Sequence, residues 1–257
     1  MSSGLPVLPV QPLFGVEVST CSFAEARDTL LSIAASGDAA TVEFVAVNNL
    51  VIANEDAGFG DILETFDYIF PDGTPVVWAA NRMSGARRAE RITARDMMNE
   101  LCAAAADAEV SVYFYGSTDD VVHALAASMR DKFPRLGIAG YEASVFRPLS
   151  DSEDRALTHR INESGAGIVF VGLGCPLQEQ FISDHRESIE AVQLCVGSAF
   201  KFLAGHHSIP PVWIQRMGLE WLVRVYQEPR RLWQRYLRTN SKFLWMLLRG
   251  AVRSKLR

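Results

Sequence analysis

Residues 166–180, AGIVFVGLGCPLQEQ, constrain the fold of this chain more than any other stretch. Residues 168–171 are apolar without alternation and mostly β-branched, which is typical of a strand buried on both faces. Gly172 and Gly174 then indicate a loop, and Pro176 is at a position where a helix could begin. In a parallel sheet such a junction lies at the carboxyl edge, where ligands bind and where free helix N–H groups attract phosphate. An ordinary strand-to-helix turn without a ligand fits the pattern equally well.

Strand and helix patterns alternate along the rest of the chain. Strands are predicted at 41–47, 110–115, 137–142 and 192–196, and helices at 24–36, 55–67, 94–108, 119–132 and 151–164. Helices of about ten residues or more between strands act as crossover connections of a parallel sheet. The sequence therefore predicts an α/β fold with a mainly parallel sheet flanked by helices. Residues 1–12, with three prolines, are expected to form an extended lead-in to one short strand.

Length and composition describe a globular chain. At 257 residues, 49% of them hydrophobic and 21% charged, it is expected to form one main domain. The apolar run at 243–248 is far shorter than the roughly 20 residues of a membrane span, and no basic segment leads into an apolar core at the start. We therefore expect neither a transmembrane helix nor a signal peptide. Four widely spaced cysteines without a CxxC pair predict neither a zinc site nor a disulfide framework, which favours a reducing cytoplasm.

The charge is distributed unevenly. Residues 208–257 hold eleven Lys or Arg and two Glu, a net charge of +9, so the other 207 residues carry −14. This tail also holds four of the five tryptophans, and its basic residues recur at helical spacing, namely Arg231, Arg235, Arg238 and Lys242. Pro229 separates this helix from an earlier one, so we divide the chain into a body, 1–207, and a basic helical appendage, 208–257. Such a tail suits an anionic membrane surface or nucleic acid, or it packs on an acidic partner surface.

Polar side chains follow two of the apolar runs. Asp72 lies in a turn that also contains Pro71, Gly73 and Pro75. It either stabilises the turn, as Asp often does, or acts as a general base on a rigid loop. Asn48 and Asn49 follow the strand at 41–47, where paired amides bind hydroxyl groups or close a turn.

Charged residues near two helix starts also have two interpretations. Arg91 precedes a helix for which Thr93 is the expected cap, and it either reinforces an anion site or is a solvated surface charge. Asp119 and Asp120 could suggest a metal. Because both fall in the first turn of a helix, where acids favour the dipole and cap amides, we predict no metal ligation there.

Several segments, in order over nearly the whole chain, resemble the WecG/TagA/CpsF bacterial glycosyltransferases, glycosyltransferase family 26. The matching segments are AVNNLVIA at 46–53, FPDGTPVVWA at 70–79, ERITARD at 90–96, FYGS at 114–117, VGLGCPLQE at 171–179, VGSAFKFLAG at 196–205 and GLEWLVRVYQEPRRLWQRYL at 218–237. Each is weak by itself, but together they are highly specific. The chain departs from the family pattern at Ala46, Ala94 and Lys201.

This resemblance implies an inverting, metal-independent transferase with a Rossmann-like fold. Its donor would be a UDP-sugar carrying a hexose-type sugar, and its acceptor a polyprenyl-diphosphate-linked saccharide used in bacterial surface polysaccharide synthesis. The reaction would take place at the cytoplasmic face of the cell membrane, with the enzyme bound peripherally. The resemblance also allows a homo-oligomer, and it does not name the sugar that is transferred.

Several residues occupy motif positions that have a role in the family. Asp72 is similar to the family's proposed catalytic base and Asn48 to an asparagine that contacts substrate. Arg91 is similar to a functional arginine and Gln178 to a glutamine of the active-site pocket. The basic tail resembles a membrane-associating appendage, whose expected membrane and acceptor contacts are Arg224, Arg231, Arg235, Arg238 and Lys242.

Without a metal, other groups must hold the charge that develops on the departing UDP. Arg91, helix-start amides and Lys201 are suited to this. The expected donor contacts are Gly116, Ser117, Gly172, Gly174, Glu179, Gly197 and Lys201. We expect no cofactor besides the UDP-sugar, which is a substrate.

Two other functions share parts of these patterns. A strand followed by Gly-x-Gly also occurs in Rossmann-type oxidoreductases that bind a nucleotide cofactor, but residues 172–178 lack the third glycine of GxGxxG. A basic-tailed nucleic-acid-binding protein would use the arginine stripe on phosphates, but the body is acidic and no recognition motif is present. We therefore predict glycosyl transfer, keep the oxidoreductase as the alternative, and expect no nucleic-acid partner.

Overall fold

The computed structural model describes residues 4–84, 88–211, 214, 220–227, 233 and 238–247. Within these residues a six-stranded sheet has the order β4-β3-β8-β7-β5-β6, and each pair of neighbouring strands is parallel. Its strands are β3 Ala40–Val45, β4 Tyr68–Pro71, β5 Val112–Gly116, β6 Ile138–Glu142, β7 Ile168–Gly172 and β8 Val192–Cys195. The predicted α/β fold with a parallel sheet is confirmed.

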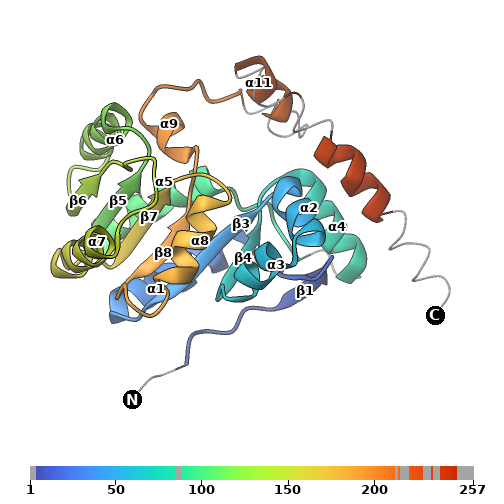
Figure 1. Ribbon diagram of the computed structural model, residues 1–257, viewed down its shortest axis with the longest axis horizontal. Coiled ribbons are helices and arrows are strands. Elements are labelled where there is room, and N and C mark those ends of the chain that lie inside the picture. The colour runs from blue at the N-terminus through green and yellow to red at the C-terminus, as the bar shows by residue number, and fades with distance from the viewer. Residues whose placement is uncertain are drawn as a thin grey trace.

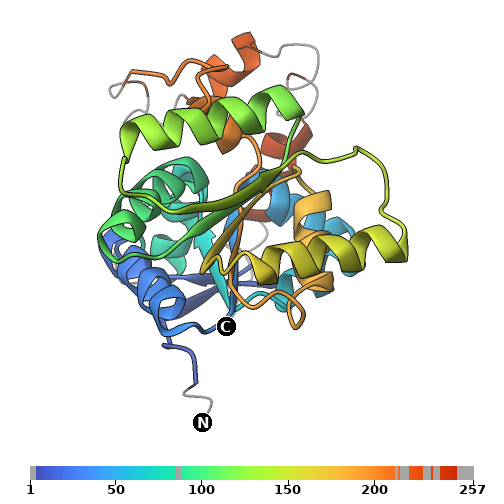
Figure 2. The ribbon, with the colours of Figure 1, turned by 90° about the vertical axis from the view of Figure 1, so that its left-hand side faces the viewer.

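Helices cover both faces of this sheet (Figures 1 and 2). They are α1 Phe23–Ser36, α2 Val47–Glu55, α3 Ala57–Glu64, α4 Thr74–Ser84, α5 Ala94–Asp107, α6 Asp119–Lys132, α7 Asp151–Glu163, α8 Leu177–Asp184, α9 Ala199–Leu203 and α11 Glu220–Gln227. One buried core includes side chains of α1, α5, α6 and α9, and the other those of α2, α3, α7 and α8. Figure 2 shows α6 and α7 on opposite faces accordingly.

Strand β7 is buried on both faces, as its apolar run predicts. Ile168 and Phe170 belong to one core, while Val169 and Val171 belong to the other. This division follows from the alternation of side chains along a strand. The fully apolar run is therefore explained by two layers of helices, which leave no polar face for the central strands.

The glycines that end β5 and β7 allow a close approach. Gly116 has φ +118°, and a Cβ there would lie 2.7 Å from the backbone carbon of Gly172. A Cβ on Gly172 would lie 2.6 Å from the ring of Phe200. Side chains at these positions would push the strand ends and α9 apart, so packing alone requires both glycines.

The prediction of an extended lead-in through residue 12 is wrong. Strands β1 Val10–Leu13 and β2 Val16–Ser19 form an antiparallel hairpin, with Pro12 opposite Glu17. A proline without an N–H group is tolerated in an edge strand, and β1 has a partner on one side only within the described residues. The prolines at 6, 9 and 12 therefore led to the prediction of an extended lead-in where residues 10–13 form a short strand.

The interpretation of Asn48 and Asn49 as a strand end is also wrong. Strand β3 ends at Val45, and α2 begins at Val47, so both amides lie in the first turn of a helix. The Asn49 side-chain oxygen accepts a hydrogen bond from the Ala46 N–H at 3.2 Å. The single helix predicted at 55–67 is instead the end of α2 followed by α3, with Asp56 accepting from the Gly58 N–H at the start of α3.

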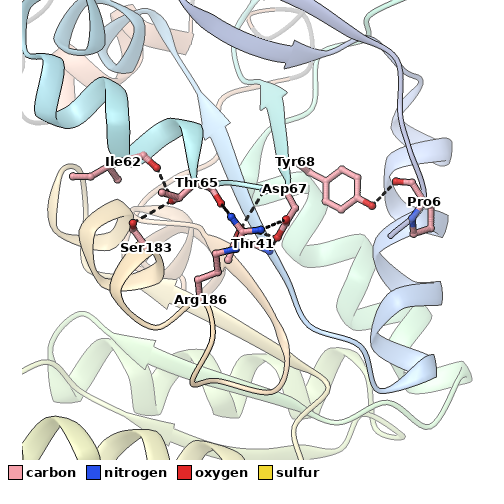
Figure 3. Close-up of polar contacts among 8 residues, drawn as sticks. All are labelled: Pro6, Thr41, Ile62, Thr65, Asp67, Tyr68, Ser183 and Arg186. Atoms are coloured by element: carbon pink, nitrogen blue, oxygen red, sulfur yellow. Dashed lines mark hydrogen bonds and ion pairs between the residues drawn. The ribbon is translucent and has the colours of Figure 1, made fainter. Parts of the chain in front are cut away.

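A polar network joins elements at the amino ends of β3 and β4 (Figure 3). Asp67 accepts from the Thr41 N–H at 2.8 Å and from its hydroxyl at 2.9 Å. Arg186, which follows α8, pairs with the same carboxylate at 2.7 Å and donates to the Thr65 carbonyl. The network fixes β3, β4 and α8 relative to one another at the edge opposite to the strands' carboxyl ends.

In the tail, residues 208–211 are not helical, whereas the described residues from 214 on are helical and contact the body. Residues 238–247 form a helix in which Phe243 is buried and lies 5.7 Å from Phe14, measured between ring centroids. Lys242 pairs with Glu55 at the end of α2, and Arg238 lies 3.8 Å from the same carboxylate. Arg231 and Arg235 lie outside the described residues, as does the side chain of Arg224.

The tail contains no membrane-spanning helix in its described part. Across the described residues of the whole chain, none of the helices is long and apolar enough to cross a membrane. The division into a body at 1–207 and an appendage at 208–257 stays a prediction.

Candidate active site

A cavity of about 720 Å³ lies at the carboxyl edge of the sheet. Its lining comes from the ends of β3 and β8, from the segments that follow β3, β4, β7 and β8, from the start of α5, and from the tail. This is the edge at which parallel α/β sheets bind ligands. It is also where the sequence predicted a site.

Four predicted site residues meet in this cavity. Asp72, Asn48, Arg91 and Gln178 all line it. They come from the turn after β4, the first turn of α2, the segment before α5 and the first turn of α8. The fold thus brings together, in one space, four polar groups that are far apart along the chain.

The turn that carries Asp72 is held on both sides. The Asp72 N–H donates to the Val45 carbonyl at 2.9 Å, which joins the end of β4 to the end of β3. The Ile92 N–H donates to the Pro71 carbonyl at 3.0 Å, which holds the segment of Arg91 against the same strand end. The carboxylate and the guanidinium therefore stand on backbone segments that are hydrogen-bonded to one another.

The loop between β7 and α8 is closed by Gln178. Its side-chain oxygen accepts a hydrogen bond from the Gly174 N–H at 3.1 Å, and its backbone N–H donates to the Gly174 carbonyl at 3.1 Å. The loop contains a cis peptide bond between Cys175 and Pro176. Gln178 therefore shapes the cavity wall and also contributes an amide to it.

The seven expected donor contacts divide into two groups. Gly174 and Gly197 line the cavity. The other five described positions lie outside its lining, and as donor contacts they stay predictions: Gly116, Ser117, Gly172, Glu179 and Lys201.

Two buried carboxyl groups, Glu43 in the cavity lining and Glu179 just outside it, share one amide partner. The side-chain nitrogen of Asn49 donates to Glu43 at 3.0 Å and to Glu179 at 3.1 Å. Glu43 is 1% exposed and Glu179 is fully buried. Among the described residues, the second oxygen of each carboxyl has no hydrogen-bond partner. One amide therefore bridges β3 and α8 through a pair of acids.

Burial changes the protonation of this pair. Burial, and after it the neighbouring Glu179 carboxyl, raises the pKa of Glu43 well above its ordinary value. Burial also raises the pKa of Glu179. Two like charges enclosed together are unfavourable, so the pair holds a proton more firmly in the folded chain than in the unfolded one.

Two charged residues that the sequence analysis did not single out also line the cavity. Arg95 lies in the first turn of α5, and Glu220 begins α11 of the tail. Glu220 forms ion pairs with both Arg91 and Arg95. The tail therefore reaches the site through a carboxylate held by two guanidinium groups.

Large apolar side chains surround these polar groups. Trp78, Leu177, Trp221 and Leu244 line the cavity and are 55%, 64%, 40% and 61% exposed. Two of them come from the body and two from the tail. Exposed apolar groups gathered at one opening mark a surface for an apolar partner.

A metal site is not evident in the described part of the chain. There, no group of three or more His, Cys, Asp or Glu residues could hold a metal ion. Asp119 and Asp120 are exposed in the first turn of α6, and each lies near a histidine, at 3.5 Å and 3.9 Å respectively. Among the described lining residues, Arg91 and Arg95 bring guanidinium groups to the cavity.

Sequence signals existed for some of the residues that were missed. Glu43 is a charged residue inside the apolar run at 41–47, which is unusual for a buried strand and marks a satisfied or functional acid. Arg95 lies in the first turn of the helix predicted at 94–108, close in sequence to Arg91, which makes it a second candidate for an anion site. Glu220 has no comparable local signal, because only the folding of the tail brings it to the site.

A parallel α/β sheet that ends in a cavity with a carboxylate, amides and paired guanidinium groups is typical of enzymes acting on anionic substrates. A family model described as the glycosyl transferase WecG/TagA/CpsF family matches residues 11–257. The chain belongs to this family of glycosyltransferases. This confirms the resemblance found in the sequence.

A relative from Bacillus subtilis (strain 168) has a more specific name. It is an N-acetylglucosaminyldiphosphoundecaprenol N-acetyl-beta-D-mannosaminyltransferase. The two sequences are 32% identical over 187 residues, which cover 72% of this chain and 70% of the relative.

The buried acids predict a pH dependence of stability. Because their pKa values are raised on folding, the folded chain binds more protons, and stability falls as pH rises from the ordinary value of 4.5 through the raised values. Replacing Glu43 with Gln removes one titrating group. The loss of unfolding free energy with rising pH should then be smaller, by about 1.4 kcal/mol for each pH unit by which folding raises the pKa of Glu43. Thermal unfolding followed between about pH 5 and pH 8 measures this.

A surface control separates this effect from a general loss of charge. Glu64 is exposed on α3, so Glu64→Gln removes the same charge without touching the pair. If the stability of Glu43→Gln falls with pH as steeply as that of Glu64→Gln, the buried pair does not govern the pH dependence.

Proposed function

We propose that this glycosyltransferase moves a hexose-type sugar from a UDP-sugar to a polyprenyl-diphosphate-linked saccharide, with inversion and without a metal ion. The observation that carries the proposal is that Asp72, Asn48, Arg91 and Gln178 all line one cavity at the carboxyl edge of the sheet. Membership of the glycosyltransferase family supports this function over the oxidoreductase alternative.

Asp72 acts as the general base in this proposal. Its carboxylate takes the proton of the acceptor hydroxyl, and the hydroxyl oxygen attacks the anomeric carbon of the sugar. The bond between that carbon and the diphosphate oxygen breaks, and UDP leaves with the electron pair. Attack from the face opposite to the leaving group inverts the anomeric centre. The hydrogen bonds that hold the backbone around Asp72 support this role, since a base must be fixed relative to its proton.

Positive groups in the cavity stabilise the departing UDP. Arg91 lines the cavity beside the Asp72 turn and can meet charge that develops on the diphosphate. Amides contribute as hydrogen-bonding groups, with Asn48 at the start of α2 directed to substrate hydroxyls.

The acceptor side of the proposal rests on the opening of the cavity. Its exposed apolar side chains are suited to a membrane surface, because the lipid of a polyprenyl-linked acceptor is confined to the bilayer. The basic tail supplies charge toward anionic lipid. We therefore propose peripheral attachment at the cytoplasmic face of the cell membrane.

The relative's name guides the choice of substrates. Its acceptor is N-acetylglucosaminyldiphosphoundecaprenol and its transferred sugar is N-acetyl-β-D-mannosamine. We propose the same classes for this chain, a lipid-diphosphate-linked saccharide and a hexose-type sugar. UDP-N-acetylmannosamine is therefore the first donor for a screen of UDP-sugars. A homo-oligomer stays a prediction.

Replacing Asp72 with Asn should nearly abolish transfer, because the amide cannot take the acceptor's proton. Loss of a general base typically lowers the rate by about 10²- to 10⁴-fold. The measurement is the turnover of UDP-sugar with a lipid-linked acceptor. Asp61→Asn on the exposed surface of α3 is the matched control and should keep full activity. Near-normal turnover of a folded Asp72→Asn chain would remove Asp72 from the mechanism.

Transfer should continue in the presence of EDTA, because guanidinium groups and amides take the place of a divalent ion at the diphosphate. The rate is measured with the chain pretreated with chelator, and then again after Mg²⁺ or Mn²⁺ is added back. A rate that collapses in EDTA and returns with either ion would contradict metal independence.

Reversing the basic stripe should release the chain from anionic membranes. Each basic residue near an anionic leaflet contributes roughly 1 kcal/mol, so four changes to Glu remove several kcal/mol of attraction and add repulsion. The four residues are Arg231, Arg235, Arg238 and Lys242. Co-sedimentation with phosphatidylglycerol-containing vesicles at low and high salt measures binding, and salt should weaken that of the wild-type chain.

A matched control keeps the change in net charge the same. Four exposed basic residues of the body are changed to Glu instead, namely Arg130, Lys132, Arg135 and Arg155. This control should still sediment more strongly than the stripe variant. Equal sedimentation of the stripe variant and the wild-type chain would mean that the stripe only packs the tail against the body, where Lys242 already pairs with Glu55.

A further inference from the structure

Arg91 and Arg95 form a pair of guanidinium groups in the cavity. Arg91 stands just before α5 and Arg95 in its first turn, and both line the cavity. Their side chains are 23% and 12% exposed. Charged groups that are largely withdrawn from water interact strongly with any anion between them.

Contacts with Asp96 and Phe202 also hold Arg95 in place. Its Nε donates to Asp96 at 2.8 Å, which orients the plane of the guanidinium. The guanidinium carbon lies 5.9 Å from the centre of the Phe202 ring, also in the cavity wall. A fixed planar donor is suited to binding an oxyanion, because little side-chain freedom is lost on binding.

The carboxylate of Glu220 occupies the space between the two arginines. One of its oxygens pairs with Arg91 Nη1, and the other accepts from Arg95 Nη1 at 3.3 Å. Glu220 comes from the tail, 125 residues beyond Arg95 in the sequence. Here each guanidinium group binds one of the two oxygens of a single anion. The same arrangement suits two oxygens of a phosphate or diphosphate.

We propose that Arg95 joins Arg91 in binding the diphosphate of the nucleotide-sugar donor, and that Glu220 holds this position until the donor displaces it. The inference rests on the proposed function, which already requires an anion here. A diphosphate diester carries two negative charges, one on each phosphoryl group, against two guanidinium groups, whereas Glu220 carries one. The donor is therefore the better match in charge and replaces the carboxylate.

Displacement of Glu220 links donor binding to the tail. The ion pairs of Glu220 attach α11 to the body, so a donor that removes them frees this attachment. By reciprocity, an attached Glu220 weakens donor binding by the same factor. The tail thus competes with the donor for the two arginines.

Binding of UDP to the full chain, measured by isothermal titration calorimetry without acceptor, tests this. Arg95→Gln should raise the dissociation constant about tenfold or more, as expected for loss of a charge-assisted hydrogen bond. Arg95→Lys should weaken binding less, because it keeps the charge and loses the planar donor. Glu220→Gln should lower the dissociation constant about threefold or more, since a competing anion is gone.

The two variants are expected to change UDP affinity in opposite directions, which a purely structural role of the Arg95–Glu220 ion pair would not produce. Arg95→Gln and Glu220→Gln break the same ion pair, so a pair that only docks the tail would change UDP binding in the same direction in both variants. Arg27→Gln, on α1, is the control for loss of a surface arginine and should bind UDP as the wild-type chain does. Thermal unfolding confirms that each variant is folded.

The outcomes also distinguish this inference from the proposed function. If the wild-type chain binds UDP, and Arg95→Gln binds it equally well or Glu220→Gln binds it no more tightly, the inference is wrong and the function stands. If the wild-type chain binds no UDP at all, the donor class and the inference are both wrong.

Discussion

The amide of Asn49, enclosed between the carboxyl groups of Glu43 and Glu179, is the contact on which the site most depends. It joins β3, α2 and α8, and two of these elements carry Asn48 and Gln178 into the cavity. Because all three side chains are buried, water cannot replace a lost partner, and a break would leave polar groups without hydrogen bonds. The raised pKa values of the two acids follow from the same burial, so the network that shapes the site also makes its stability sensitive to pH.

Titratable groups lie at two places around the cavity. The buried Glu43 and Glu179 form one of them, and burial raises the pKa of both carboxyl groups. The other is in the cavity lining, with the Asp72 carboxylate on the turn after β4 and the guanidinium groups of Arg91 and Arg95 near the start of α5. This separation suits glycosyl transfer, in which a proton is taken at one point while negative charge develops on the leaving diphosphate at another. The backbone bonds between the segments of Asp72 and Arg91 keep these two points in a fixed relation.

The tail is part of the site as well as an attachment to the body. Its last described helix buries Phe243 against the hairpin residue Phe14, and α11 brings Glu220 to the two arginines. Trp221 and Leu244 then complete an apolar opening whose other members come from the body. Exposed apolar side chains and the two guanidinium groups therefore lie around one cavity, as the proposed transfer to a lipid-linked acceptor requires.

The sequence by itself determined most of the elements and several of the side chains that line the cavity. Apolar runs such as 168–171 specify buried strands, and the turn around Asp72 is set by its own prolines and glycine, because these are local properties of the chain. Local patterns were read wrongly at some element ends, as where the Asn49 side chain accepts from the Ala46 N–H and a helix begins at Val47. What tertiary structure alone decided was which distant groups meet. Asn49 reaches Glu179 across 130 residues, and Arg91 reaches Glu220 across 129. Such contacts depend on the order of strands in the sheet and on the path of the tail, and no spacing within one segment encodes either.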